Sequence, residues 1–156
     1  MSYEKRVRRV VPYTPGEQPA DGNIIKLNTN ENPYPPAPAV ERVLRDFGSR
    51  TDALKKYPDP TCRKLREALG EAYDIAPERI FVGVGSDDVL AMSFLTFFAS
   101  EDPVIFADIT YSFYDVWAEL FRIPYETIPL DEDYRIVADD YMRPCGGIVI
   151  ANPNAP

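Results

Sequence analysis

Residues 79–107 read RIFVGVGSDDVLAMSFLTFFASEDPVIFA, in which two short apolar runs flank a glycine turn and a longer apolar segment. The lengths of these segments predict a buried strand at residues 79–84, a helix at residues 89–99 and a second buried strand at residues 104–107. Strands that alternate with helices of this length are typical of βαβ units, which build a largely parallel sheet. The segment therefore predicts an α/β fold.

The same alternation continues toward the end of the chain. A helix is predicted at residues 111–121, a strand at residues 125–130 and a further strand at residues 148–151. The last of these strands runs into the turn Asn152–Pro156, which is rich in asparagine and proline. Because α/β enzymes bind ligands at the carboxyl ends of their strands, we expect this chain to be the front part of a larger enzyme that ends at its own active site.

Two further helices are predicted before residue 79. The first covers residues 39–47 and ends at Gly48. The second is expected to be capped by Thr61. Its apolar face is formed by Leu65, Ala68, Leu69 and Ala72. Together with the later elements, these helices predict a mostly parallel sheet with flanking helices.

Residues 1–38 differ from the rest of the chain in their proline content. Prolines at positions 12, 15, 19, 33, 35, 36 and 38 block a regular helix. A short apolar stretch at residues 24–27 could pair as an edge strand. We therefore expect an extended N-terminal arm at residues 1–38, followed by the first part of an α/β domain at residues 39–156.

The composition excludes several classes of function. The net charge of −8 argues against nucleic acid as a partner, because duplex binding depends on lysine and arginine that neutralise phosphates. No apolar run is long enough to span a membrane, and no signal peptide is evident. The chain has only two cysteines and no histidine, so a disulfide framework, a Ser-His-Asp triad and most zinc sites are not expected within it. We expect a cytoplasmic location.

The turn Gly83–Asp88, between a predicted strand and a predicted helix, is the first candidate site. Glycines let the backbone approach a ligand closely, and the N–H groups at a helix N-terminus attract phosphate. Alternatively, Ser86 or Asp87 simply caps the helix. The turn also has a superficial likeness to a dinucleotide-binding fingerprint, for which Asp108 would be the ribose-binding acid.

Two more candidate sites follow predicted strands. Tyr111 begins a predicted helix and could place its ring on a flat heterocycle, although these residues alone favour packing roles for Tyr111, Phe113 and Tyr114. The asparagines of the terminal turn could bind a ring substituent, or they could be ordinary turn residues. The loops that follow parallel strands lie at the same edge of a sheet. The three candidate sites are therefore expected close together, which supports a shared ligand site more than any one of them does alone.

These motifs resemble the histidinol-phosphate aminotransferase family, whose members are fold type I enzymes that depend on pyridoxal 5'-phosphate (PLP). The resemblance runs from about Pro12 to Pro156, with the motifs in family order and at family spacing. They are Lys26–Tyr34, Tyr57–Pro60, Phe81–Leu90, Thr110–Tyr114, Ile128–Asp131 and Ile150–Pro156. The resemblance implies amino transfer between glutamate or 2-oxoglutarate and imidazole-acetol phosphate, in histidine biosynthesis.

The resemblance also implies roles for individual residues. Gly85, Ser86 and Asp87 match the loop that holds the cofactor phosphate, and Tyr111 matches the aromatic residue stacked on the pyridine ring. Asn154 is the residue of the terminal turn that we assign to the phenolic oxygen of the cofactor, although many relatives have asparagine where this chain has Ala155.

Other matching residues imply a dimer and a substrate site. Tyr57 matches a tyrosine that reaches the cofactor phosphate of the second subunit in a homodimer. Tyr13, Asn30 and Glu31 match arm residues near a small amino acid or oxo acid substrate.

The family's Schiff-base lysine has no counterpart in this sequence. The lysines present are Lys5, Lys26, Lys55, Lys56 and Lys64, and none lies in the family's lysine motif. That lysine is expected beyond residue 156, so we expect the isolated chain to be inactive.

The sequence is also compatible with other functions. The chain could be a non-catalytic phosphate- or nucleotide-binding α/β module, a partly folded product without activity, or a relative that acts on another amino acid.

Overall fold

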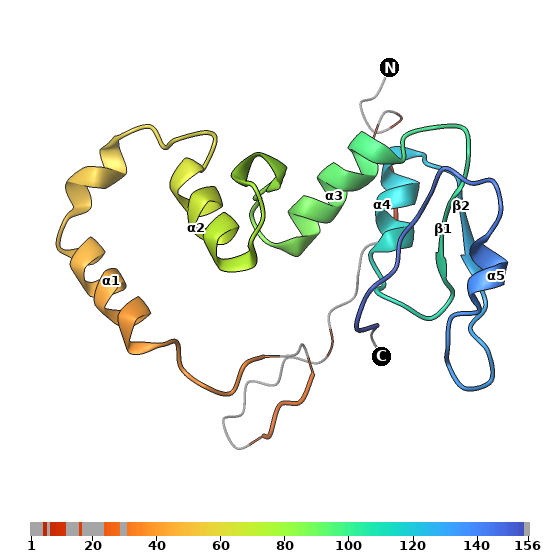
Figure 1. The fold of residues 1–156 in the computed structure, drawn as a ribbon, viewed down its shortest axis with the longest axis horizontal. Coiled ribbons are helices and arrows are strands. Elements are labelled where there is room, and N and C mark those ends of the chain that lie inside the picture. The colour runs from red at the N-terminus through yellow and green to blue at the C-terminus, as the bar shows by residue number, and fades with distance from the viewer. Residues whose placement is uncertain (1–4, 6, 12–15, 17–23, 29–30, 155–156) are drawn as a thin grey trace. The chain divides into compact units, whose positions relative to one another are not determined.

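The computed structural model describes residues 5, 7–11, 16, 24–28 and 31–154 (Figure 1). The chain divides into two compact units. One comprises residues 1–14 and 83–156, and it contains the sheet. The other comprises residues 15–82 and contains two α-helices in its described part. The predicted boundary between an arm and a domain at residue 38 stays a prediction.

Parallel strands form the sheet of the first unit. Within the described residues these are β1 (Val104–Ala107), β2 (Tyr125–Ile128) and β3 (Gly147–Ile148), in the order β2-β1-β3. Val104 of the central strand lies opposite Tyr125 on one side and Gly147 on the other. The predicted parallel sheet is confirmed, and its central strand has the predicted bounds.

Helices connect these strands, as parallel neighbours require. Helix α3 (Ser86–Phe97) precedes β1, α4 (Tyr114–Phe121) joins β1 to β2, and the short α5 (Ala138–Tyr141) lies between β2 and β3 in the chain. The helix predicted at residues 111–121 begins later than expected. The reason is a turn in which the Tyr114 amide donates to the Tyr111 carbonyl at 3.3 Å.

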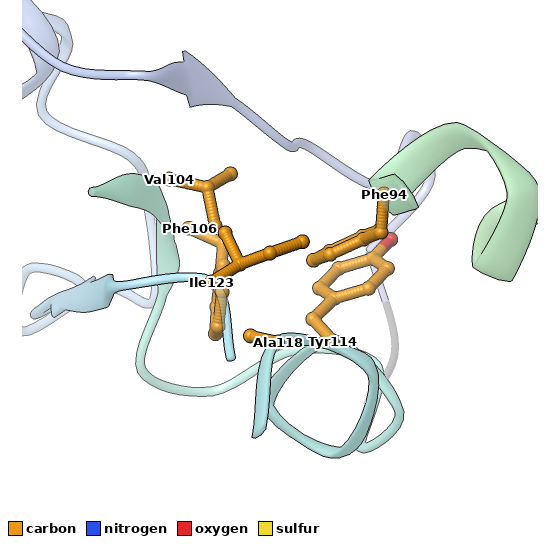
Figure 2. Close-up of a cluster of buried hydrophobic side chains, with 6 residues drawn as sticks. All are labelled: Phe94, Val104, Phe106, Tyr114, Ala118 and Ile123. Atoms are coloured by element: carbon orange, nitrogen blue, oxygen red, sulfur yellow. The ribbon is translucent and has the colours of Figure 1, made fainter. Parts of the chain in front are cut away.

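The core lies on both faces of β1, because successive side chains of a strand point to opposite faces. One face buries a cluster that α3 and α4 cover, and the ring of Phe94 stacks on that of Tyr114 with centroids 6.1 Å apart (Figure 2). This cluster consists of Phe94, Val104, Phe106, Tyr114, Ala118 and Ile123. On the opposite face, Ile105 packs with Ile128 and with Tyr141 of α5. The flanking helices predicted from the sequence are therefore confirmed.

The buried strand predicted at residues 79–84 is wrong. This segment begins in the short 3₁₀-helix η3 (Pro77–Arg79) and then runs without strand pairing, leaving Phe81 and Val84 63% and 94% exposed. The apolar residues at 24–27 do not form a strand either. An extended segment becomes a strand only when a neighbour takes its backbone hydrogen bonds, and none of the described residues does so here.

The helices of the second unit are α1 (Pro38–Gly48) and α2 (Arg63–Tyr73), with the 3₁₀-helix η2 (Thr51–Lys55) between them. α1 has Pro38 at its first turn, where the missing N–H costs nothing, and it extends to the predicted stop at Gly48. α2 packs against η3 through Gly70, where a side chain would collide with the Ile75 carbonyl at 2.6 Å.

The cap predicted for α2 is also wrong. Cys62 precedes the helix with a positive φ of 47°, and no side chain caps α2 in the usual position. Instead, the carboxylate of Asp59 accepts hydrogen bonds from the Thr61 amide, the Thr61 hydroxyl and the Arg63 amide, at 2.9, 2.7 and 3.1 Å. The ionised Asp59 side chain has two acceptor oxygens, so it can accept more hydrogen bonds than a threonine hydroxyl could.

Candidate functional site

The three candidate loops lie in the first unit, and hydrogen bonds between side chains join them. The loop before α3 contains Gly85, the loop after β1 contains Tyr111, and the turn after β3 contains Asn154. β1 and β3 are parallel neighbours, so their following loops leave the sheet at the same edge.

Glycine occupies both ends of the turn before α3, for two different reasons. Gly85 has a φ of 89°, and a side chain there would point into open space, with no atom within 4 Å. Gly83 has no such space, because a Cβ atom would lie 2.5 Å from the Asp88 carboxylate. That carboxylate accepts a hydrogen bond from the Val84 amide at 3.0 Å. The Asp88 carboxylate therefore holds the backbone of the turn at Val84, while the space beside Gly85 stays open.

The structure does not support a capping role for Ser86 or Asp87. Gly85 is the N-cap of α3, and no side chain caps that helix. Among the described residues, the amides of Ser86 and Asp87 have no hydrogen-bond partner. Unpaired amides at a helix N-terminus are suited to an anion such as phosphate.

A hydrogen bond to the hydroxyl and aromatic contacts to the ring hold the Tyr111 side chain in place. Its hydroxyl donates to the Asp87 carboxylate at 2.5 Å. Its ring stacks on Phe113 with centroids 5.6 Å apart, and meets Tyr114 edge-on at 5.7 Å. The aromatic packing expected as one alternative is present, and it is combined with a polar contact to the turn before α3.

Asn154 joins the terminal turn to the loop after β1. Its amide nitrogen donates to the Ile109 carbonyl at 2.9 Å, and its amide oxygen accepts from the Thr110 hydroxyl at 2.7 Å. An amide with one donor and one acceptor already paired has a defined orientation. Its nitrogen retains a second hydrogen.

The structure does not test the roles of the remaining predicted site residues. Tyr57 and Glu31 belong to the other unit, where Tyr57 is 90% exposed and Glu31 forms an ion pair with Lys26. Tyr13 and Asn30 lie outside the described residues. The roles of all four stay predictions.

Sequence analysis missed the roles of Asp88 and Thr110. Asp88 ends the Gly83–Asp88 turn, and the sequence predicts no role for it. Its position four residues after Val84 is the signal for a carboxylate that folds back onto a turn amide. Thr110 has no comparable local signal, because its partner Asn154 is 44 residues away in sequence.

Groups of side chains that could hold a metal ion are absent from the described residues. Likewise, none of the helices in the described part of the chain is both long and apolar enough to cross a membrane.

Comparison with known proteins gives consistent results. Histidinol-phosphate aminotransferase 1 of Burkholderia pseudomallei is 51% identical over 151 residues, which are 96% of this chain and 42% of that protein. The histidinol-phosphate aminotransferase of Chromohalobacter salexigens is 53% identical over 150 residues, with the same coverage of 96% and 42%. The chain thus spans 42% of the length of these relatives.

The fold is similar to that of solved aminotransferases. The crystal structure of histidinol-phosphate aminotransferase from Sinorhizobium meliloti in complex with pyridoxal-5'-phosphate superposes with a TM-score of 0.70 at 24% identity. The match covers 82% of this chain and 35% of that one. A putative histidinol-phosphate aminotransferase from Erwinia carotovora also gives a TM-score of 0.70, at 18% identity, covering 83% of this chain and 38% of that one. These likenesses confirm the predicted fold type I α/β domain.

The resemblance drawn from the motifs is also confirmed. The model of the family described as aminotransferase class I and II matches residues 22–156. This range includes the turn before α3, the loop after β1 and the terminal turn. The chain therefore belongs to the class I and II aminotransferase family.

Proposed function

We propose that the full-length protein containing this chain is a PLP-dependent histidinol-phosphate aminotransferase. It would transfer an amino group between glutamate or 2-oxoglutarate and imidazole-acetol phosphate, in histidine biosynthesis. The observation that supports this most strongly is the 51–53% identity with relatives of that name over nearly the whole chain.

The residues at the edge of the sheet fit PLP. Gly85 leaves open space beside the turn, and the amides of Ser86 and Asp87 have no hydrogen-bond partner among the described residues. Phosphate binds to such amides, and the Ser86 hydroxyl adds a further donor. We therefore assign the cofactor phosphate to Gly85, Ser86 and the backbone of Asp87.

The other two loops fit the cofactor ring. The phenol ring of Tyr111 provides a flat apolar surface for the pyridine ring. The second amide hydrogen of Asn154 is available for the phenolic oxygen of the cofactor, because the first is donated to the Ile109 carbonyl. When bound, PLP supplies an electron sink for the α-carbon of the amino acid, and these residues hold and orient it.

The second unit would contribute to a homodimer. Tyr57 is 90% exposed on a turn that two prolines restrict, so its phenol is accessible to another subunit. We propose that it binds the cofactor phosphate of the second subunit, and that Tyr13, Asn30 and Glu31 lie near the substrate. A cytoplasmic location, with small molecules rather than nucleic acid or membrane as partners, belongs to the same proposal.

The test uses the full-length protein. Titration with PLP should give a saturable visible absorbance change, and histidinol phosphate with 2-oxoglutarate should yield glutamate. Phenylalanine and threonine phosphate, tested in parallel, distinguish relatives with other substrates. Binding of NAD or S-adenosylmethionine without any response to PLP would overturn the proposal in favour of a non-catalytic nucleotide-binding module.

A further inference from the structure

The Asp87 side chain faces Tyr111. Asp87 lies in the first turn of α3 and Tyr111 in the loop after β1, 24 residues further along the chain. The phenol donates to the Asp87 carboxylate at 2.5 Å, and both side chains are half-buried. A short hydrogen bond to an ionised acceptor is one of the stronger polar contacts in a protein.

Charge argues against a direct contact between the Asp87 side chain and a phosphate. A carboxylate and a phosphate are both negative, and they repel each other more strongly in a partly buried site than in water. In this structure the carboxylate binds a phenol, which is a hydrogen-bond donor. The backbone amide of Asp87 remains suited to the phosphate, while the side chain has a different partner.

The same hydrogen bond completes the positioning of the Tyr111 ring. The loop before Tyr111 is tied down by Asn154, which binds the Ile109 carbonyl and the Thr110 hydroxyl. Phe113 contacts the ring by stacking. A bond at the far end of the phenol then restricts both side-chain torsions, so the ring is oriented before any ligand arrives.

We propose that Asp87 is a positioning residue, whose carboxylate orients the ring of Tyr111 for stacking on the cofactor and does not bind the cofactor phosphate. This inference rests on the proposed function, because it takes the ring that Tyr111 covers to be that of PLP.

The experiment compares PLP with pyridoxal, which has the same ring without the phosphate, in the full-length protein. Dissociation constants are measured by visible absorbance for wild type, Asp87→Ala, Asp87→Asn and Tyr111→Phe. Asp87→Ala should weaken binding of both compounds by up to about tenfold, because a ring that is no longer held in place loses side-chain freedom when it stacks on the ligand. Tyr111→Phe should show the same loss, and the double variant no more than either alone.

Two variants serve as controls. Asp87→Asn keeps a carbonyl oxygen that can accept the phenol, so it should retain most of the affinity. Asp115→Ala removes an acidic residue from the second position of α4, the position that Asp87 occupies in α3, and it should leave both dissociation constants unchanged. Thermal unfolding of the cofactor-free proteins checks the fold. If Asp87→Ala does not fold, Tyr111→Phe provides the test, because it deletes only the hydroxyl.

The possible outcomes separate the two proposals. A loss with PLP but none with pyridoxal would assign the Asp87 side chain to the phosphate and overturn the inference. Wild-type affinity of Asp87→Ala for both compounds would overturn it as well, while leaving the proposed function intact. A wild-type protein that binds neither compound would reject the proposed function, and the inference with it.

Discussion

Gly85 combines a positive φ with open space, and these two features have separate consequences. An L-residue at the Gly85 φ of 89° and ψ of 173° is strained by about 1–3 kcal/mol. The added Cβ atom would also enter the space that we assign to the cofactor phosphate. Gly85→Ala should therefore lower the thermal stability of the cofactor-free full-length protein slightly, and its affinity for PLP more strongly.

A second glycine provides the control for this prediction. Gly48 ends α1, and a side chain there would meet nothing within 4 Å. Gly48→Ala should leave the PLP dissociation constant unchanged. Equal PLP affinity of Gly85→Ala and wild type would contradict the assignment of the phosphate to this turn.

Tyr57 is predicted to act across the dimer. A phenol–phosphate hydrogen bond is charge-assisted, so Tyr57→Phe should weaken PLP binding by the full-length protein about ten- to hundred-fold. The dimer and the fold should be unaffected, because the phenol is exposed. Tyr73→Phe, which deletes the hydroxyl of another exposed tyrosine in the same unit, is the matched control.

A mixing experiment tests the sharing directly. Subunits with Tyr57→Phe are combined with subunits that lack the cofactor-binding lysine. In a heterodimer, one of the two sites then has both the lysine of its own subunit and Tyr57 of the other subunit. Recovery of activity on mixing supports a shared site. Equal PLP affinity of Tyr57→Phe and wild type would exclude it.

At the scale of elements, Asp59 organises the start of α2. The Thr61 hydroxyl, followed by the Thr61 and Arg63 amides, lowers the pKa of the Asp59 carboxyl below its ordinary value of 3.8. A carboxyl whose pKa is lower in the folded state stabilises that state above the unfolded pKa. This contribution is lost as the pH falls through the folded pKa. The acid-dependent loss is therefore expected below pH 3.8.

This prediction is measured by NMR titration of the Asp59 carboxyl carbon. Thr61→Ala removes the hydroxyl that has the largest effect, so it should raise the pKa of Asp59 toward 3.8. Thr51→Ala, in the nearby η2, should not change it. An Asp59 pKa that is the same in wild type and Thr61→Ala would disprove this account of the turn.

The attachment of α3 to the sheet depends on Phe94. Its side chain is fully buried between β1 and α4, whereas Phe97 of the same helix is 72% exposed. Phe94→Ala should lower the free energy of unfolding of the full-length protein by about 3–5 kcal/mol, through lost burial and a residual cavity. Phe97→Ala should cost much less, because its side chain is mostly exposed. Denaturant unfolding compares the two variants. Equal losses in the free energy of unfolding would contradict the burial of Phe94 between β1 and α4.

At the scale of the whole molecule, two buried tyrosines and one half-buried tyrosine predict sensitivity to alkali. Burial raises the pKa of Tyr114, Tyr125 and Tyr141 above the ordinary value of 10.0, and Glu119 adds to the effect at Tyr125. A raised pKa favours the neutral phenol in the folded state. The resulting stability is complete below pH 10 and is lost as the pH rises through the folded pKa values.

Chemical unfolding of the full-length protein at increasing pH measures this loss. The free energy of unfolding should fall above pH 10, and Tyr114→Phe should reduce the fall. Tyr134→Phe, which changes a tyrosine that is 74% exposed, is the control. If Tyr114→Phe and wild type lose stability equally with rising pH, burial of this phenol does not explain the effect.

Local patterns in the sequence determined the class of fold and several of its elements. The apolar run at residues 104–107 is short and lies between Pro103 and Asp108, so its pattern alone predicts β1, which the structure buries fully. The apolar spacing and Gly48 predicted a helix at residues 39–47, and α1 (Pro38–Gly48) extends one residue further at each end. The ordered motifs predicted the family, since each motif is a local string of residues.

Only the tertiary structure decided which segments pair and which side chains meet. Residues 79–84 have the composition of a strand but form none, because strand formation also needs a neighbour to take the backbone hydrogen bonds. The hydrogen bonds from Tyr111 to Asp87 and from Thr110 to Asn154 connect residues 24 and 44 positions apart. Such contacts depend on how the strands are arranged in the sheet, and a local pattern of residues does not contain that information.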